Sequence, residues 1–428
     1  MSPTDLEQGI GRRLLRNLTM QSGTQAVSIV LGLVSTYVLV RYLGPESFGG
    51  FTYLFSFIYI FLALNDLGTG MTLVREIAQT PSRTIELVQN ILGLRLVLSV
   101  LSLAIGYSVI ALLPLPAAYK LSLRVFLLIL PIQAFATPAV ILQANLQMGR
   151  GSVVEMANRL TGFGLMMWSV LSGHGLLFVT LSLVCGEVVG VAAVALFTYR
   201  VAMPRPRFDF AVWRRVVRLS LPLSGNSLLV ALLNKFDALM LQALGDLTQV
   251  GFYGSAYRLP NLIERVPTLV MATLFPVMSQ LAVRDPIALR RLYRKTLFGL
   301  AALVVPMLIG VIGLAPLIVR VWFGPDYAPV VPLLRVVILS TALVYLGIAG
   351  GNLLVALNRT KANFAAMASA TAINLALNFV WIPSYGAMGA AWATVVGFGV
   401  LSGSTLVLAE LALARSVREH SAPALEGT

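Results

Sequence analysis

The sequence has very few of the residues that build most active sites. Its 428 residues include one cysteine, Cys185, and only two histidines, His174 and His420. A single cysteine excludes an intrachain disulfide, and with two distant histidines there is no set of nitrogen and sulfur ligands for a metal. The chain also lacks a G-x-S-x-G motif and a P-loop. We therefore expect a protein that is not an enzyme, has no catalytic residues, binds no metal or cofactor and does not hydrolyse ATP.

Charge is scarce as well. Charged residues make up 11% of the chain, against about 25% in an average soluble domain. Hydrophobic residues make up 58%, and the mean hydropathy is +0.86. A soluble fold cannot cover that much apolar surface. This composition excludes an ordinary cytosolic enzyme, a disordered chain and a nucleic-acid binder, and it predicts an integral membrane protein.

Long apolar runs follow one another through the whole chain. Each is about as long as the 20 residues that a membrane-spanning helix needs, and too long for a strand of a membrane barrel. The sequence therefore predicts an all-α protein of twelve transmembrane helices, at residues 19–41, 48–66, 88–113, 122–146, 153–173, 178–201, 219–242, 249–276, 294–318, 329–352, 362–382 and 387–411.

The basic residues give an orientation to these helices. Of the 31 Lys and Arg residues, 21 fall in the two tails and the even-numbered loops, and 4 fall in the odd-numbered loops. Cytoplasmic loops carry the excess of positive charge in membrane proteins. We therefore expect a multi-pass protein of the plasma (cytoplasmic or inner) membrane with both termini in the cytoplasm. This topology also accounts for most of the net charge of +14 without any nucleic-acid partner.

A polar, basic segment at Met203–Arg218 lies in the middle of the chain. Landmarks on its two sides recur about 200 residues apart: Leu43-Gly44 and Phe48-Gly49 correspond to Leu244-Gly245 and Val250-Gly251. Duplicated helical halves are common in secondary transporters, which bind substrate between them. We predict an N-terminal lobe at 1–203 with helices 1–6, a cytoplasmic linker at 204–218, and a C-terminal lobe at 219–428 with helices 7–12 and a short cytoplasmic tail. The two lobes would be parallel and pseudo-symmetric.

Ionisable side chains inside predicted helices are the candidate site, because each costs about 2.5–3.5 kcal/mol to insert. Arg258, Asn261 and Arg265 share one face of predicted helix 8, and Pro260 and Pro267 would bend that helix. Guanidinium groups suit an anionic ligand such as a phosphate. The alternative is that Arg258 or Arg265 forms a structural ion pair with Glu264 or Asp237.

Predicted helices 1 and 7 supply the other candidates. On helix 7, Lys235 and Asp237 are two residues apart and cannot face each other, so their partners must lie elsewhere. We expect Lys235 to join the cationic site, Asp237 and Asn226 to be polar or ion-coupling groups of a cavity, and Gln25 on helix 1 to line it. Arg41 ends helix 1 and either joins the site or extends to the membrane surface. Small and polar residues on these helices would equally serve close packing.

Two segments carry a resemblance to a known family. Ile373–Thr394, which contains Ile382-Pro-Ser-Tyr-Gly386 and Gly389-Ala-Ala-Trp-Ala-Thr394, resembles the helix 11–12 hairpin of the oligosaccharide flippases (Wzx/RfbX-like). Arg41–Phe51, Asp66-Leu-Gly and Val74-Arg-Glu-Ile-Ala resemble the helix 1–2 region of the same family. The family belongs to the superfamily of the MATE exporters and the lipid II flippase MurJ. Tyr257-Arg258-Leu259 and Arg41 are similar to places in the lipid II flippase where arginines lie in or near its cationic cavity.

The resemblance implies a flippase for undecaprenyl-pyrophosphate-linked oligosaccharide units. Such a protein moves them from the cytoplasmic to the outer leaflet by alternating access, for assembly of O-antigen, capsule or exopolysaccharide. The implied partners are the polyprenyl-pyrophosphate oligosaccharide, membrane lipid, and a polysaccharide polymerase with glycosyltransferases; a monomer is the default, and Na⁺ or H⁺ coupling stays open. The alternatives are a MATE-like Na⁺- or H⁺-coupled multidrug exporter, a lipid II-type precursor flippase and a scaffolding subunit of a polymerase complex.

Overall fold

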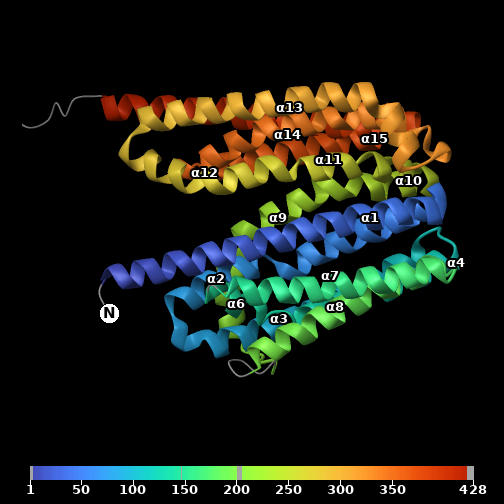
Figure 1. Cartoon of the computed structure of the whole chain (residues 1–428), viewed down its shortest axis with the longest axis horizontal. Helices are drawn as coiled ribbons and strands as arrows, with labels where there is room; N and C mark the ends of the chain where they lie inside the picture. Colours follow the sequence, from blue (N-terminus) through green and yellow to red (C-terminus); the bar gives the residue numbers. More distant parts are fainter. Residues whose placement is uncertain (1–2, 146, 200–204, 422–428) are drawn as a thin grey trace, which may run out of the picture. The chain divides into compact units, whose positions relative to one another are not determined.

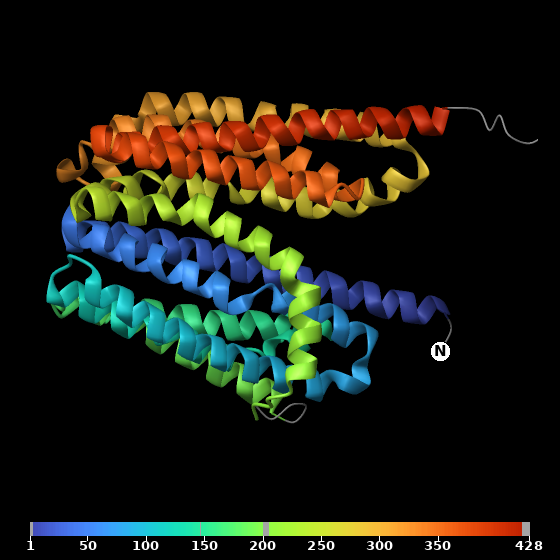
Figure 2. The ribbon, with the colours of Figure 1, turned by 180° about the vertical axis from the view of Figure 1, so that it is seen from behind.

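The computed structural model describes residues 3–145, 147–199 and 205–421, and the surroundings of side chains at 23–145, 147–199, 205–221 and 224–419. In these residues the regular structure is helical throughout, with no strand. Figures 1 and 2 show the ribbon from opposite sides. The elements in chain order are α1 (Pro3–Asp66), α2 (Thr69–Gln79), η1 (Pro81–Arg83), α3 (Thr84–Leu112), α4 (Ala117–Leu127), α5 (Ile129–Ala134), α6 (Ala139–Ala144), α7 (Met148–Leu171), α8 (Leu176–Thr198), α9 (Phe210–Leu244), α10 (Leu247–Ala256), α11 (Arg258–Ile263), α12 (Arg265–Arg284), α13 (Pro286–Trp322), η2 (Pro325–Tyr327), α14 (Val330–Ala356) and α15 (Thr360–Ser421).

The structure confirms the predicted all-α membrane fold, because its helices are long enough to cross a membrane. Within the described residues, 9 segments are long and apolar enough to cross a membrane. The first and the last each contain two predicted spans, because α1 leaves helical geometry at Gly44 (φ 69°) and α15 does so at Gly386 (φ 55°). The helix α7 is 24 residues long but carries the polar residues Glu155 and Arg159. The structure is therefore consistent with twelve spans.

The start of α9 differs from the predicted one because an N-terminal cap begins the helix earlier. The helix α9 begins at Phe210 rather than 219, so the predicted linker of 204–218 is helical from Phe210 onward. Asp209 supplies the missed start signal, since its Oδ1 accepts hydrogen bonds from the backbone N–H groups of Ala211 (2.9 Å) and Val212 (3.4 Å). Residue 204 lies outside the described residues.

The chain divides into two compact units. Unit 1 is Met1–Leu43 with Leu54–Leu228, and unit 2 is Gly44–Tyr53 with Leu229–Thr428. The short segment Gly44–Tyr53 therefore packs with residues that lie some 200 positions further along the chain. The parallel pseudo-symmetry of two lobes stays a prediction.

The core of unit 1 includes a cluster on α2, α3, α6 and the first turns of α9. Leu73, Ile91 and Val216 are among its buried members. Trp213 of α9 packs in the same cluster and donates its indole N–H to the carbonyl of Asn90 on α3 at 2.8 Å. A buried indole N–H needs such an acceptor. The helices α7 and α8 lie side by side (Figure 1), in close contact between Asn158 and Gly186.

The core of unit 2 is built by α12, α13, α14 and α15. Tyr293 of α13 and Tyr345 of α14 are fully buried there, together with Met278, Leu353 and Leu413. Both limbs of α15, before and after Gly386, run along α14, as the orange and red helices in Figure 2 show. Gly347 and Gly350 allow the second limb to come close, because a side chain at either would meet Ser402 or the backbone of Thr405.

Gly49 and Gly251, the glycines that the sequence comparison of the two halves had paired, pack against each other inside unit 2. A methyl group at Gly49 would overlap the carbonyl oxygen of Leu247, and one at Gly251 would overlap the carbonyl oxygen of Pro45. One turn further on, a methyl group at Gly254 would meet Thr52. The contacts at Gly49 and Gly251 are made by backbone atoms, and the one at Gly254 is made by the Thr52 side chain; together they hold the Gly44–Tyr53 segment on α10.

Candidate functional site in unit 2

The predicted helix 8 is one apolar stretch broken twice, into α10, α11 and α12. The breaks follow from its prolines. Pro260 cannot donate to the carbonyl of Ala256, the last residue of α10, and Pro267 cannot donate to the carbonyl of Ile263, the last residue of α11. Tyr345 of α14 donates its hydroxyl to that freed Ile263 carbonyl at 2.9 Å. The predicted bending is confirmed in the form of two breaks.

Arg258 lies directly after the first break and packs on aromatic rings. Its Cζ lies 5.1 Å from the ring centroid of Phe48 and 5.9 Å from that of Phe51. Both rings come from the Gly44–Tyr53 segment and are buried. The Nε atom of Arg258 is buried and has no hydrogen-bond partner. Within the described part of the chain, no carboxylate forms an ion pair with Arg258 or Arg265. Arg258 is thus a half-buried cation that rests on π faces.

The alternative of structural ion pairs with Glu264 or Asp237 does not describe Arg258. Glu264 accepts a hydrogen bond from the hydroxyl of Thr341 on α14 at 3.0 Å. Asp237 is 2% exposed and accepts from the hydroxyl of Tyr253, from that of Thr394 at 3.4 Å and from the N–H of Ala238 at 2.8 Å. Asp237 therefore finds its side-chain partners on other helices, as the spacing from Lys235 required. The two hydroxyl donors belong to α10 and α15, and the Ala238 N–H belongs to α9 itself.

Unit 2 holds further polar atoms that are buried without a hydrogen-bond partner. The hydroxyl of Tyr257 is buried without a hydrogen bond, and its ring is 4.8 Å from that of Tyr253. On α15, Asn378 donates to Asn374 at 3.1 Å, which leaves one polar atom of each amide buried and unpartnered. Lys235 is half-buried on α9, two residues before Asp237. Unit 2 thus brings together a cation, a buried acid and several unsatisfied polar atoms.

The remaining predicted residues are placed differently. Asn261 and Arg265 are exposed, whereas Arg258 is half-buried. Arg258 and Asn261 lie on α11, and Arg265 begins α12 after the break at Glu264. The common face predicted for the three residues stays a prediction.

Three predicted residues belong to unit 1. Arg41 is exposed and lies over the ring of Tyr37, with Cζ 4.5 Å from the centroid. Gln25 on α1 is exposed, and Asn226 on α9 is half-buried. The structure does not bring these three together with Arg258, Lys235 and Asp237 within one unit.

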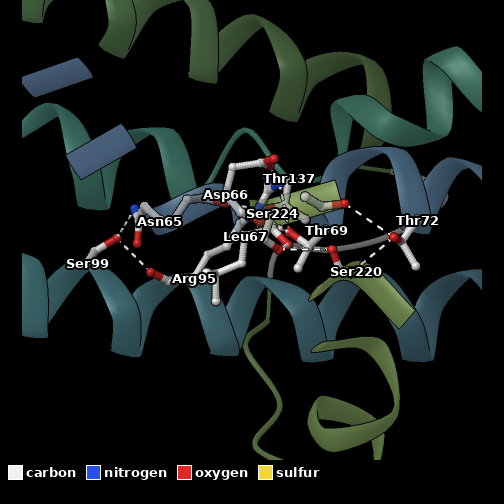
Figure 3. A network of polar contacts seen from close by, with 12 residues as sticks. Asn65, Asp66, Leu67, Thr69, Thr72, Arg95, Ser99, Thr137, Ser220 and Ser224 are labelled. Carbon is white, nitrogen blue, oxygen red and sulfur yellow. Dashed lines mark hydrogen bonds and ion pairs between the residues drawn. The ribbon is translucent and has the colours of Figure 1, made fainter. Parts of the chain in front are cut away.

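Sequence reasoning missed a polar network in unit 1, drawn in Figure 3. Arg95 of α3 forms an ion pair with Asp66 and donates to the hydroxyl of Thr69 (3.0 Å from Nη2) and to that of Thr137 (3.4 Å). Asn65 donates to Ser99 at 2.8 Å, and Ser99 donates to the carbonyl of Arg95 at 2.6 Å. The motif Asp66-Leu-Gly and the intramembrane Arg95 were the available signals.

The network surrounds the break between α1 and α2. Leu67 and Gly68 have left-handed backbones (φ 44° and 65°). From α9, Ser224 donates to the carbonyl of Leu67, and Ser220 donates to the hydroxyl of Thr72 at 3.0 Å. A cavity of about 60 Å³ lies beside it, lined in part by Asn65, whose Oδ1 has no partner. The network holds Leu67, which is not a glycine, in a strained left-handed conformation.

The fold defines a class: an all-helical, multi-pass membrane protein. The fold is similar to that of an inward-facing multidrug resistance MATE family transporter of the MOP superfamily, with a TM-score of 0.75 and 17% identity over 92% of this chain and 96% of that chain. It is equally similar to the lipid II flippase MurJ in an inward closed conformation, with a TM-score of 0.75 and 14% identity over 93% of this chain and 89% of that chain. At these identities the two structures establish the fold.

The chain belongs to the family described as polysaccharide biosynthesis protein, which it matches over residues 14–282. It is also 26% identical over 349 residues to the succinoglycan biosynthesis transport protein ExoT of Rhizobium meliloti (strain 1021). That alignment covers 79% of this chain and 68% of the relative. The predicted family is thereby confirmed; of the segments that carried the resemblance, Arg41–Phe51 lies within the matched residues and Ile373–Thr394 lies outside them.

Proposed function

We propose that this protein translocates undecaprenyl-pyrophosphate-linked oligosaccharide units from the cytoplasmic to the outer leaflet by alternating access, for assembly of a cell-surface polysaccharide. The family and the likeness to a succinoglycan transport protein support a saccharide-linked substrate. The proposal places the protein in the plasma (inner) membrane with both termini in the cytoplasm. It acts there as a monomer that hands its product to a polysaccharide polymerase.

The observation that carries the proposal is Arg258. A guanidinium that is half-buried, rests on Phe48 and Phe51 and has a buried Nε without a partner is available for an anion. Guanidinium grips phosphate oxygens through parallel N–H···O bonds and stays charged at any physiological pH. A pyrophosphate would replace a cation–π contact worth about 0.5–2 kcal/mol with a stronger charge-assisted pair. Lys235 is the second cation that we assign to this site.

The polar head group cannot cross hydrocarbon unaided, because each unpaired polar group would lose its hydrogen bonds to water. Arg258 and Lys235 would replace that hydration, while the lipid tail stays in the membrane. A membrane potential contributes about 2.3 kcal/mol per charge per 100 mV. With the inside negative, it favours movement of the anionic head outward and return of the empty cationic site.

Asp237 is the residue that we assign to ion coupling. It is buried, it already accepts from Tyr253, Thr394 and Ala238, and the unpartnered oxygen of Asn378 adds to the polar atoms of unit 2. Protonation or binding of Na⁺ at such a carboxylate would change its bonds to α10 and α15. Replacement by Asn removes the charge and keeps the shape, so Asp237→Asn is the variant that tests this role.

The test is a reconstitution in vesicles with a short-chain, labelled polyprenyl-pyrophosphate oligosaccharide. Exposure of the label on the far leaflet is followed with and without an imposed potential. We expect protein-dependent translocation, a loss of at least tenfold for Arg258→Ala, and partial retention for Arg258→Lys. Arg291→Ala, which removes an exposed arginine of α13 in the same unit, is the matched control and should keep the wild-type rate.

The same vesicles separate the alternatives. Undiminished translocation by the Arg258→Ala, Lys235→Ala double variant would contradict the cationic site. Absence of translocation combined with Na⁺- or H⁺-dependent efflux of a cationic dye, lost in Asp237→Asn, would replace the proposal with a multidrug exporter. Transport of a lipid II-type precursor in preference to other oligosaccharides would narrow the substrate to that class.

A further inference from the structure

A second cavity, of about 340 Å³, lies in unit 2 between α14 and the two limbs of α15. Its wall includes Val344 and Asn352 of α14, Asn363 of the first limb, and Phe398, Leu401 and Thr405 of the second limb. None of its lining residues is Arg258, Lys235 or Asp237. The cavity is therefore separate from the site to which transport was assigned above.

Most of the wall is apolar, and its hydroxyl groups are engaged elsewhere. Ser402 donates to the carbonyl of Leu343 at 2.6 Å, and Thr405 donates to that of Ser402 at 3.1 Å. These side chains therefore present carbon surface to the cavity. A wall that is mostly apolar offers water few hydrogen-bond partners. In a membrane the abundant apolar filler is a lipid chain.

The cavity changes character toward one end. Asn352 and Asn363 lie there, near the turn that joins α14 to α15. Asn352 donates to the carbonyl of Ile348 at 2.8 Å, which leaves its amide oxygen for other contacts. The turn carries Arg359 and Lys361, both exposed, and the first residue of α15 is Thr360. Neither cation lines the cavity itself, but both lie within four residues of Asn363, which does. With the helix N-terminus they favour a negative group at the mouth of this end.

We propose that this cavity binds one anionic phospholipid, with an acyl chain between Val344 and Phe398 and the phosphate beside Asn363, Arg359 and Lys361. The amphipathic gradient of the wall matches that of a lipid. Basic residues between helices at the membrane surface recognise anionic head groups in this way. The phospholipid fills the space between the two limbs of α15, and so stabilises the packing of α15 on α14.

The experiment uses the full-length protein in nanodiscs and in detergent. Native mass spectrometry counts the bound lipids while dioleoyl phosphatidylglycerol and dioleoyl phosphatidylcholine compete. We expect one phosphatidylglycerol to be retained in preference to phosphatidylcholine. The Arg359→Gln, Lys361→Gln double variant should lose on the order of tenfold in affinity. Val344→Phe, which fills the wall, should lose the bound lipid while the head-group charges remain.

The matched control is Arg291→Gln, Arg294→Gln, which removes two exposed cations from α13 of the same unit. It should bind lipid as the wild type does. If this control lost as much affinity for phosphatidylglycerol, the effect of the Arg359→Gln, Lys361→Gln variant would be one of general surface charge, and the proposal would be overturned. Equal retention of the two phospholipids, or full retention in Val344→Phe, would overturn it as well. Displacement of phosphatidylglycerol by a polyprenyl phosphate at equal concentration would assign the cavity to the substrate tail instead. Circular dichroism of each variant confirms that a loss of lipid is not a loss of fold.

Discussion

Gly49→Ala should destabilise the protein, because its neighbours are backbone atoms that cannot turn away. The new methyl carbon would overlap the carbonyl oxygen of Leu247 and lie 2.7 Å from its carbonyl carbon and 2.9 Å from the nitrogen of Gly251. Overpacking costs about 1–3 kcal/mol, and the upper end applies where no rotamer can relieve it. Alanine in place of a helical glycine returns about 0.5–1 kcal/mol. The expected net loss is about 2 kcal/mol of unfolding free energy.

The measurement is an SDS titration in mixed micelles, which gives the unfolding free energy of each variant. Gly299→Ala on α13 is the matched control, since nothing lies within 4 Å of a methyl group there. It should be more stable than the wild type by about 0.5–1 kcal/mol. The double variant Gly49→Ala, Gly251→Ala should lose less than the two single losses added, because one separation of the segment from α10 relieves both overlaps. A Gly49→Ala protein as stable as Gly299→Ala would refute the backbone contact.

Three further predictions rest on single hydrogen bonds or ion pairs. Tyr345→Phe should lower the unfolding free energy by about 1–3 kcal/mol, because the Ile263 carbonyl, which Pro267 cannot bond, would lose its hydrogen-bond donor. Tyr385→Phe, at an exposed tyrosine, is the control and should change the unfolding free energy by less than about 0.5 kcal/mol. Trp213→Phe should cost about 1 kcal/mol by the same measurement, since it removes the bond to Asn90 but keeps an aromatic ring, and no loss would contradict that bond. Asp66→Asn should make trypsin cleave the protein faster, because it leaves Arg95 without its ion pair at the strained Leu67–Gly68 break; unchanged cleavage would remove the network's structural role.

Hydropathy and charge were enough to predict the helical membrane fold, because every backbone polar group in lipid must be satisfied within a helix. They could not predict where helices begin. The start of α9 depends on the side chain of Asp209, and its signal was hidden in a basic, proline-containing stretch that resembled a linker. Prolines predicted the bend in helix 8 correctly, but not that a break would place Arg265 on a different helix from Arg258 and Asn261.

The candidate site was only partly within reach of the sequence. The free energy needed to insert a charged side chain into a membrane singled out Arg258, Lys235 and Asp237. The two-residue spacing of Lys235 and Asp237 showed that Asp237 needed partners elsewhere. The identity of those partners is a matter of tertiary packing: Tyr253 and Thr394 lie 16 and 157 residues away. Similarly, Asp66 and Arg95 are 29 residues apart on different helices, and no local pattern pairs them.

Arg258 and the Gly44–Tyr53 segment depend on each other. The segment is held on α10 by glycine backbone contacts, and in that position it presents Phe48 and Phe51 to the guanidinium. If an anionic head group draws Arg258 off the rings, the segment loses one of its contacts to unit 2 and keeps those of Gly49, Gly251 and Gly254. The segment also continues at both ends into residues of unit 1, so a change in its hold on α10 acts on the connection between the units. Substrate binding and the conformational step of the proposed transport would then share one residue.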